Sequence, residues 1–209
     1  MLKAAHALII LALMLTGQTQ NAATNKTQQD SARTPDVVYV GTPDDMVLKM
    51  LDLAGLKKDD VIFDLGCGDG RVLVLAAQKY GCHGKGYEID PERFEIAVAN
   101  VRENGVASLV NIIQQDIFTL DLSEADVISL YLLPGLNIKL LPQLEKLKPG
   151  SRIVTHEYGF EGYTPDKVFS GMSNEDNTHH NLYLYVTPMK KQDSDLQSQL
   201  SSLQSPIQQ

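Results

Sequence analysis

The chain has 209 residues, a formal net charge of −8 and a hydrophobic fraction of 43%. This length suits one domain with a core large enough to need no disulfide framework, so Cys67 and Cys82 are predicted to be small core residues. The acidic balance, without a cluster of Lys and Arg, argues against a protein that binds DNA by neutralising its phosphates.

The first predicted element is a targeting segment. Lys3 precedes an apolar run at 4–15, and Ala22 and Ala23 then offer small residues for a signal peptidase. The run is shorter than the roughly 20 apolar residues of a membrane span. Residues 1–23 are therefore predicted to be a signal peptide or a membrane anchor. The protein is therefore expected to be exported, to the periplasm or the medium, or to be anchored in a membrane. An anchor with the domain facing the cytoplasm is the alternative.

The domain itself is expected at 37–188, between a polar linker at 24–36 and a Gln- and Ser-rich tail at 189–209 that is predicted to be disordered. Inside it, amphipathic helices alternate with short apolar strands, which indicates a parallel sheet with right-handed crossovers. Two strands near the C-terminal end, 166–172 and 181–187, are separated only by a polar loop and predict an antiparallel hairpin. The predicted fold class is α/β: a three-layer, Rossmann-like, seven-stranded sheet, mostly parallel, with an antiparallel C-terminal hairpin strand.

The helices are predicted from their caps and apolar spacing. Thr42 is expected to be the N-cap of the first helix, with Pro43 at its first position and Gly55 at its end. Later helices are expected at 70–80, at 91–104 after the cap Asp90, and at 137–147 with a bend or restart at Pro142. The remaining strands are expected at 61–65, 85–89, 109–114, 126–132 and 151–157.

Three glycines, Gly66, Gly68 and Gly70, follow the first strand in "FDLGCGDGR". Ligands of open α/β sheets bind outside the carboxyl ends of the strands, where such a loop meets a helix N-terminus. The dinucleotide-binding spacing fails because Arg71 occupies the place of the third glycine, and the Gly-Lys-Ser/Thr of a P-loop is absent. The carboxylates Asp64 and Asp69 would repel phosphates, so a cationic or uncharged ligand such as an aminoacyl sulfonium is favoured.

Acidic residues also end the next two strands. Glu88 follows Asp64 by 24 residues and is expected to accept two hydrogen bonds from ribose hydroxyls. Asp116 follows the third strand and is placed to accept a proton from an adenine amino group. Single acidic residues are usually solvated loop charges, but three at consecutive strand ends predict a nucleoside site.

The segments "FDLGCGDGR", "GYEID", "QQDIF" and "LYLLP" resemble the motifs of class I S-adenosylmethionine-dependent methyltransferases over residues 37–188. More narrowly, "YVGTP" and "SLYLLPGLN" are similar to the seven-strand protein-lysine methyltransferases that include archaeal broad-specificity enzymes and mitochondrial enzymes acting on the c subunit of ATP synthase. The family usually has Pro where this chain has Gly41. The resemblance implies S-adenosyl-L-methionine as cofactor, with contacts from Thr42, Gly66, Gly68, Glu88 and Asp116, and places Tyr131 to Pro134 beside the transferred methyl. Asp64, Gly70 and Ile117 complete the predicted cofactor-binding set.

The predicted function is methyl transfer to a nucleophile, with a protein lysine amine as the favoured acceptor and Tyr131 and Pro134 as acceptor-positioning residues. A small-molecule or RNA acceptor, or a cofactor-binding module without catalysis, are the alternatives. The segment after the fourth strand lacks the Asn/Asp-Pro-Pro-Tyr/Phe pattern of DNA amino-methyltransferases, so no DNA partner is expected. Membrane association is expected only through residues 4–15.

Histidines further along the chain are assigned no metal. His156 and Glu157 follow the fifth strand and are candidates for a general acid and base, although neighbouring residues in a strand point to opposite faces. His179 and His180 fit no zinc-site spacing and are predicted to lie in a solvated hairpin loop.

Overall fold

A computed structural model describes residues 39–192. The predicted targeting segment and linker, and residues 193–209 of the predicted tail, lie outside the described residues and stay predictions. Among residues 39–192, no helix combines the length and the apolar character needed to cross a membrane.

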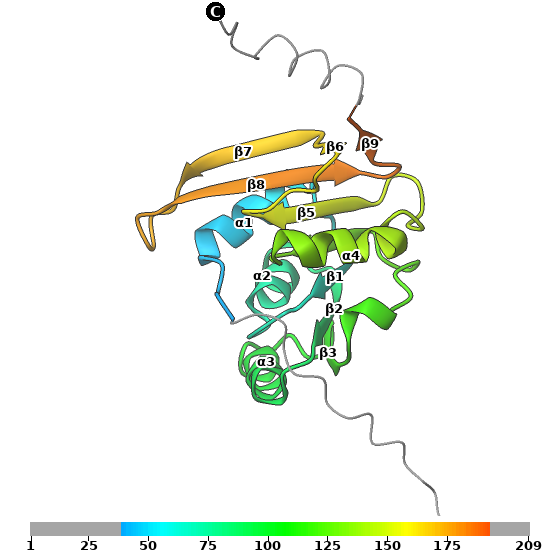
Figure 1. The fold of residues 1–209 in the computed structure, drawn as a ribbon. Helices are drawn as coiled ribbons and strands as arrows, with labels where there is room; N and C mark the ends of the chain where they lie inside the picture. Colours follow the sequence, from blue (N-terminus) through cyan, green and yellow to red (C-terminus); the bar gives the residue numbers. More distant parts are fainter. Residues whose placement is uncertain (1–38, 193–209) are drawn as a thin grey trace, which may run out of the picture. The chain divides into compact units, whose positions relative to one another are not determined.

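The core of the domain is a seven-stranded sheet with the spatial order β3-β2-β1-β4-β5-β8-β7 (Figure 1). The pairs from β3 through to β5 are parallel, whereas β8 runs antiparallel to both β5 and β7. The predicted fold class, including the C-terminal hairpin, is confirmed. The strands are β1 (Val61–Leu65), β2 (His83–Glu88), β3 (Val110–Gln114), β4 (Val127–Leu130), β5 (Arg152–His156), β7 (Lys167–Met172) and β8 (His179–Val186), and a separate pair is formed by β6 (Tyr163–Thr164) and β9 (Lys190–Lys191).

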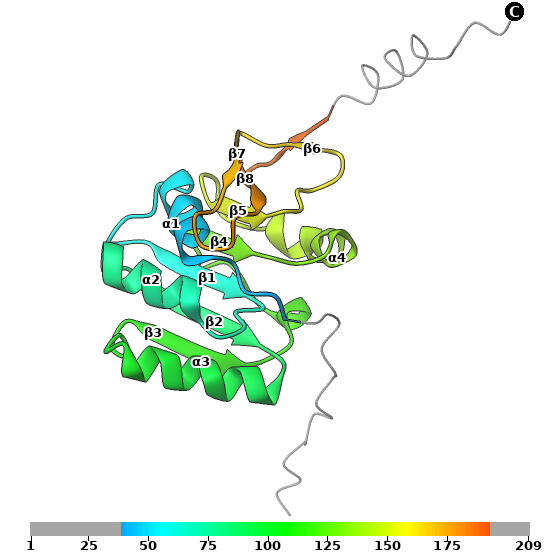
Figure 2. The same cartoon turned by 90° about the vertical axis from the view of Figure 1, so that its left-hand side faces the viewer.

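Helices cover both faces of the sheet and bury it in two clusters (Figure 2). One face packs against α1 (Asp44–Leu53), α2 (Arg71–Tyr80) and α3 (Pro91–Glu103), with Leu51, Leu73 and Ala97 in the cluster. The other packs against α4 (Pro134–Leu144) and the short 3-10 helix η1 (Ile117–Thr119), with Leu140 and Leu144 fully buried. Cys67 and Cys82 are buried and unbridged, as predicted.

The N-terminus of α1 is capped differently from the prediction. Its N-cap position is Pro43, and the carboxylate of Glu175, in the loop between β7 and β8, accepts hydrogen bonds from the backbone N–H groups of Asp44 and Asp45, both at 2.9 Å. A carboxylate at this end also complements the helix dipole. Thr42 is free of the capping role because its hydroxyl bonds instead to His156.

The fourth helix also departs from the prediction. It begins at Pro134 rather than at residue 137, with Leu133 as an extended N-cap residue and the proline in the first turn. It continues through Pro142 without a break, because Pro142 lies two residues before the helix end and its missing N–H removes only one bond in the last turn.

Candidate active site

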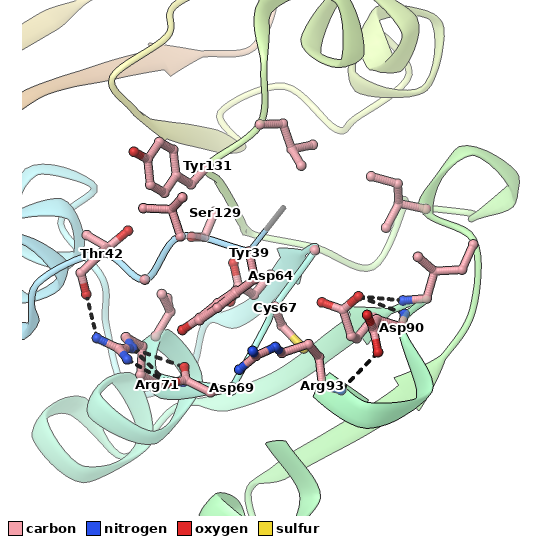
Figure 3. A pocket seen from close by; sticks show the side chains of 18 of the residues that line it. Tyr39, Thr42, Asp64, Cys67, Asp69, Arg71, Asp90, Arg93, Ser129 and Tyr131 are labelled. Carbon is pink, nitrogen blue, oxygen red and sulfur yellow. Dashed lines mark hydrogen bonds and ion pairs between the residues drawn. The ribbon is translucent and has the colours of Figure 1, made fainter. Parts of the chain in front are cut away.

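The sheet order reverses beside β1, where β2 and β4 flank the same strand, and a pocket lies at the carboxyl ends of these strands (Figure 3). This is the place where open α/β sheets bind ligands. The structure brings seven of the predicted site residues together in the lining of this pocket: Thr42, Asp64, Gly66, Glu88, Asp116, Ile117 and Tyr131. Gly68, Gly70 and Pro134 are not among the lining residues.

The glycine loop joins β1 to α2 in a conformation that requires glycine. Gly66, Gly68 and Gly70 have φ values of 81°, 58° and 77°, in the left-handed region. The N–H groups of Gly66 and Cys67 both donate to the carbonyl of Tyr87, at 2.9 and 3.0 Å, which fixes the loop to β2. A Cβ at Gly70 would lie 3.3 Å from the Cβ of Ala97, so this glycine allows α2 to approach α3. Gly70 therefore serves the packing of α2 against α3 rather than contact with a ligand.

Asp64 carries a buried carboxyl group at the end of β1. Its pKa is raised to about 7, mainly by burial and in part by the neighbouring carboxylates of Glu88 and Asp69, while a hydrogen bond with Ser129 opposes the shift. The group therefore titrates near neutral pH. A cation held nearby would favour the ionised form, which makes this end of the pocket suited to a positively charged ligand.

Glu88 at the end of β2 is held by the backbone. Its Oε2 accepts a bond from the N–H of Gly68 at 2.8 Å, and its Oε1 accepts bonds from Ile89 and Asp90 at 2.8 and 2.9 Å. A carboxylate offers about four acceptor positions. Three are used here, so one hydroxyl can be added directly, and a second one would have to replace one of these backbone bonds.

Asp116 and Ile117 close the pocket beside β3. Asp116 is the N-cap residue of η1, and its Oδ1 accepts a bond from the N–H of Phe118 at 3.0 Å. This cap explains why the chain turns directly after β3 and brings Ile117 and Phe118 to the pocket wall.

A side chain that the sequence analysis missed lies across the glycine loop. A Cβ added at Gly68 would overlap the ring of Tyr39, so the ring rests on this glycine. The guanidinium carbon of Arg93 lies 4.5 Å from the centroid of the same ring. Burial raises the pKa of the Tyr39 hydroxyl to about 12. The two contacts join residues far apart in the chain, and no local pattern could have predicted them.

Arg71 was also missed, although the sequence carried a signal for it. A cation at the first position of a helix opposes the helix dipole and needs a partner. The partner is Asp69, at 2.6 Å, while Nη1 of Arg71 donates to the carbonyl of Thr42 at 3.0 Å, as Figure 3 shows. A Cβ at Gly41 would lie 2.9 Å from Cζ of Arg71. Gly41, in place of the usual Pro, therefore leaves room for this guanidinium.

His156 stands behind the pocket wall. Its ring packs against Tyr131, with 4.1 Å between the ring centroids, its Nδ1 lies 2.9 Å from Oγ1 of Thr42, and its Nε2 lies 2.9 Å from Nδ1 of His180. Burial lowers the pKa of His156 to about 4, so the ring is neutral at pH 7. Neither His156 nor Glu157 lines the pocket, so the sequence-based role of general acid or base finds no support in the geometry.

The prediction for His179 and His180 is wrong in part. The strand β8 starts two residues earlier than expected, at His179, so both histidines lie within it. His179 is exposed, but His180 is only 7% exposed and its ring contacts Glu157 and Asp176.

Comparisons with known proteins agree with this geometry. The family described as the ANTKMT methyltransferase domain matches residues 64–167. A protein-lysine N-methyltransferase of Saccharolobus islandicus is 42% identical over 154 residues, which are 73% of this chain and 94% of that protein. The lysine N-methyltransferase of Xenopus laevis that is named for the c subunit of ATP synthase is 28% identical and is covered over 53% of its length, 59% of this chain. The crystal structure of an RNA methyltransferase from Salinibacter ruber, in complex with S-adenosyl-L-homocysteine, matches with a TM-score of 0.67 and 41% identity over 75% of this chain and 99% of that one.

The residues at the pocket fit S-adenosyl-L-methionine as cofactor. The buried carboxyl of Asp64 suits a cationic ligand, Glu88 keeps an acceptor position, and Gly66 lines the pocket without a side chain. The similar Salinibacter ruber structure holds the demethylated product of this cofactor. The chain belongs to the class I S-adenosylmethionine-dependent methyltransferases, in the family related to the lysine methyltransferases of the ATP synthase c subunit.

Proposed function

We propose that the enzyme transfers the methyl group of S-adenosyl-L-methionine to a lysine amine of a protein. The observation that carries the proposal is the composition of the pocket beside β4, where the ring of Tyr131 lies with the apolar side chains of Leu132 and Leu136. The name of the Saccharolobus islandicus relative, which this chain covers almost completely, supports a lysine acceptor.

For this reaction the protein mainly has to position the lysine amine against the methyl group of the cofactor. The cofactor supplies a methyl group on a sulfonium, and its transfer is an in-line displacement that needs a neutral amine and little water. Leu132 and Leu136 disfavour the charged ammonium form of an entering lysine. The face of Tyr131 can accommodate the positive charge that develops on the nitrogen. Pro134, in the first turn of α4, fixes the backbone that follows Tyr131.

The test uses the full chain, S-adenosyl-L-methionine with a tritiated methyl group, and an unfolded lysine-rich polypeptide. Label is expected in the polypeptide and is expected to be absent from the same polypeptide after chemical acetylation of its lysines, which leaves no nucleophilic amine. Tyr131→Phe is expected to retain most of the rate and Tyr131→Ala to lose it, because the ring face is the feature used. Equal labelling of the blocked polypeptide would exclude lysine as acceptor.

An RNA acceptor is the second candidate, since the similar Salinibacter ruber protein is described as an RNA methyltransferase. The formal net charge of −8 opposes it, because binding to RNA depends on neutralising phosphates. Total RNA is therefore included as a parallel substrate. Label in RNA and none in the polypeptide would replace the lysine proposal.

We also propose that residues 1–23 direct the chain to a membrane, either as a cleaved export signal or as an anchor. An anchor with the domain on the cytoplasmic side would keep the enzyme where its cofactor is made and near membrane-embedded lysines. The test is N-terminal sequencing of the mature protein together with protease treatment of intact cells. A mature N-terminus near Thr24 with full protease access would exclude the anchor, and a full-length chain in the soluble fraction would exclude both forms.

A further inference from the structure

Three side chains at the end of β5, where it pairs with β8, direct ligand atoms at one point. Nε2 of His156 lies 2.9 Å from Nδ1 of His180, Oε1 of Glu157 lies 3.1 Å from Nδ1 of His180, and the remaining distance, from Oε1 of Glu157 to Nε2 of His156, is 3.4 Å. The ligand atoms around a tetrahedral zinc ion, with bonds of about 2.0–2.1 Å, are about 3.3 Å apart. The three atoms therefore already stand near the corners that such an ion requires.

The other ring nitrogen of each histidine has a hydrogen-bond partner, as is usual for histidines that bind a metal. Nδ1 of His156 meets the hydroxyl of Thr42 at 2.9 Å. Nε2 of His180 meets the carboxylate of Asp176 at 3.1 Å and the hydroxyl of Thr178 at 2.8 Å. Partners of this kind fix the ring orientation and leave the opposite nitrogen for the ion.

Glu157 reaches the same point through an unusual backbone conformation. Its φ is 59°, in the left-handed region that a residue other than glycine seldom adopts. This turn at the end of β5 brings Glu157 to the side of His156, where regular strand alternation would have separated them. Its carboxylate is also oriented by the backbone N–H of Asn181, at 3.3 Å from Oε1. Such strain persists where the surroundings require the conformation.

We propose that His156, Glu157 and His180 form a zinc site that fixes the wall behind Tyr131. Two imidazoles and one carboxylate are donors that zinc accepts, and three protein ligands leave a position for water on the side where the Glu157 side chain is 24% exposed. The ion stands behind Tyr131 and outside the pocket lining, so its role is to hold that wall. Zinc motifs close in sequence are absent because His156 and His180 come from β5 and β8, which pair in the sheet but are separated by β6 and β7 in the chain (Figure 1).

The competing arrangement has a proton in place of the ion. A doubly protonated His180 would donate from Nδ1 to Glu157 and from Nε2 to Asp176, beside a neutral His156. The two arrangements predict opposite results in a metal titration.

In the experiment, the full chain is treated with a chelator, the chelator is removed by dialysis, and Zn²⁺ is titrated in competition with a chromogenic chelator. One Zn²⁺ per chain is expected, and Co²⁺ as the spectroscopic probe is expected to give the visible absorption of a low-coordinate site. His180→Ala is expected to abolish binding, and Glu157→Gln to weaken it by at least about tenfold. Zinc is expected to raise the Tm of the wild-type protein and to leave that of His180→Ala unchanged.

His179→Ala is the matched control, since His179 is the adjacent and exposed residue of the same strand. It is expected to bind Zn²⁺ as the wild type does. Titration with S-adenosyl-L-methionine checks that each variant is folded, and Glu157→Gln, which keeps the side-chain volume, serves if His180→Ala does not fold. The proposal would be overturned if Glu157→Gln bound zinc as tightly as the wild type, or if His179→Ala and His180→Ala lost binding equally. It would also be overturned if the wild type took up no zinc, and that result would favour the protonated His180.

Discussion

Buried polar groups differ in their hydrogen-bond partners and charge state between the β1–β2 side of the pocket and the β5–β8 side behind Tyr131. Asp64 on the first side lies in a buried site where its ionised form is disfavoured, and Glu88 beside it retains an acceptor position. On the second side, both ring nitrogens of His156 and of His180 have partners. The cofactor side therefore has positions that a ligand completes, whereas the histidines of the β5–β8 side already have partners within the chain.

This difference has an energetic meaning. A carboxyl group that favours its neutral form while buried makes the cofactor-free protein less stable at neutral pH than it could be. Binding sites commonly carry such a cost, since the group is suited to the ligand rather than to the empty fold. The comparison predicts that substitutions on the β1–β2 side will separate stability from binding, and that substitutions on the β5–β8 side will act on stability.

Removal of Glu88 is expected to have the largest effect. Glu88→Ala leaves three backbone N–H groups without their acceptor, at a cost of about 1–3 kcal/mol for each one that stays buried, and removes the predicted ribose contact. Calorimetric titration is expected to show binding of S-adenosyl-L-methionine weakened by about 100-fold or more. The exposed Glu161, changed to Ala, is the control and should bind as the wild type does. Unchanged affinity in a folded Glu88→Ala protein would remove Glu88 from the cofactor site.

Asp64→Asn is expected to stabilise the cofactor-free protein at neutral pH. The pKa of Asp64 in the folded state, about 7, lies above the ordinary value of 3.8 expected for the unfolded chain. Between these values the folded protein holds a proton that the unfolded chain has lost, so the free energy of unfolding falls as the pH rises. The total fall is at most about 4 kcal/mol and is complete above pH 7. Urea denaturation between pH 4.5 and 8 measures it.

The slope should disappear in Asp64→Asn and persist in the control Asp59→Asn, which changes an exposed acid. Cofactor binding provides the complementary observation. A cation favours the ionised carboxyl, so the affinity of the wild type for S-adenosyl-L-methionine should rise as the pH passes 7, and that of Asp64→Asn should not. A wild-type protein whose stability rises between pH 5 and 7 would contradict the assignment.

Local patterns were sufficient to predict much of the fold and of the cofactor side. The glycine loop and the acidic ends of β1 and β2 lie within one strand-helix-strand unit, where strand ends and helix starts follow from residue types. Pro134 stands in the first turn of α4 as Pro91 does in α3, so the same rule predicts both starts, although the apolar spacing alone predicts a later start for α4.

Contacts between residues far apart in the chain could not be predicted from local patterns. The cap of α1 comes from Glu175, 131 residues after Asp44, and a local rule assigned it to Thr42 instead. The convergence of His156 and His180 depends on the register of β5 against β8 and on the backbone turn at Glu157. The register of these two strands, which are separated by β6 and β7 in the chain, is set by side-chain packing, which one sequence does not display.

Gly68→Ala is expected to cost more than Gly105→Ala, although both glycines have positive φ, 58° and 71°. Each substitution carries a conformational cost of about 1–2 kcal/mol. A Cβ at Gly68 would in addition overlap the ring of Tyr39, whereas one at Gly105 meets nothing within 4 Å. The extra loss is expected to be about 1–3 kcal/mol, with weaker cofactor binding in Gly68→Ala alone. The double variant Tyr39→Ala with Gly68→Ala should recover part of it, and equal costs for the two single variants would show that the ring does not rest on the loop.

The smallest expected effect separates two buried threonines, Thr42 beside His156 and Thr155 in β5. Thr42→Val removes the hydroxyl partner of His156 and is expected to lower the free energy of unfolding by about 1–2 kcal/mol. Thr155→Val removes a buried hydroxyl that finds no hydrogen-bond partner within residues 39–192, so it is expected to be neutral or stabilising. Valine matches threonine in shape at both positions, which leaves the hydrogen bond as the difference. If urea denaturation gave the two variants equal stability, the bond from Thr42 would contribute nothing, and the order of the β5–β8 side would have to come from its packing.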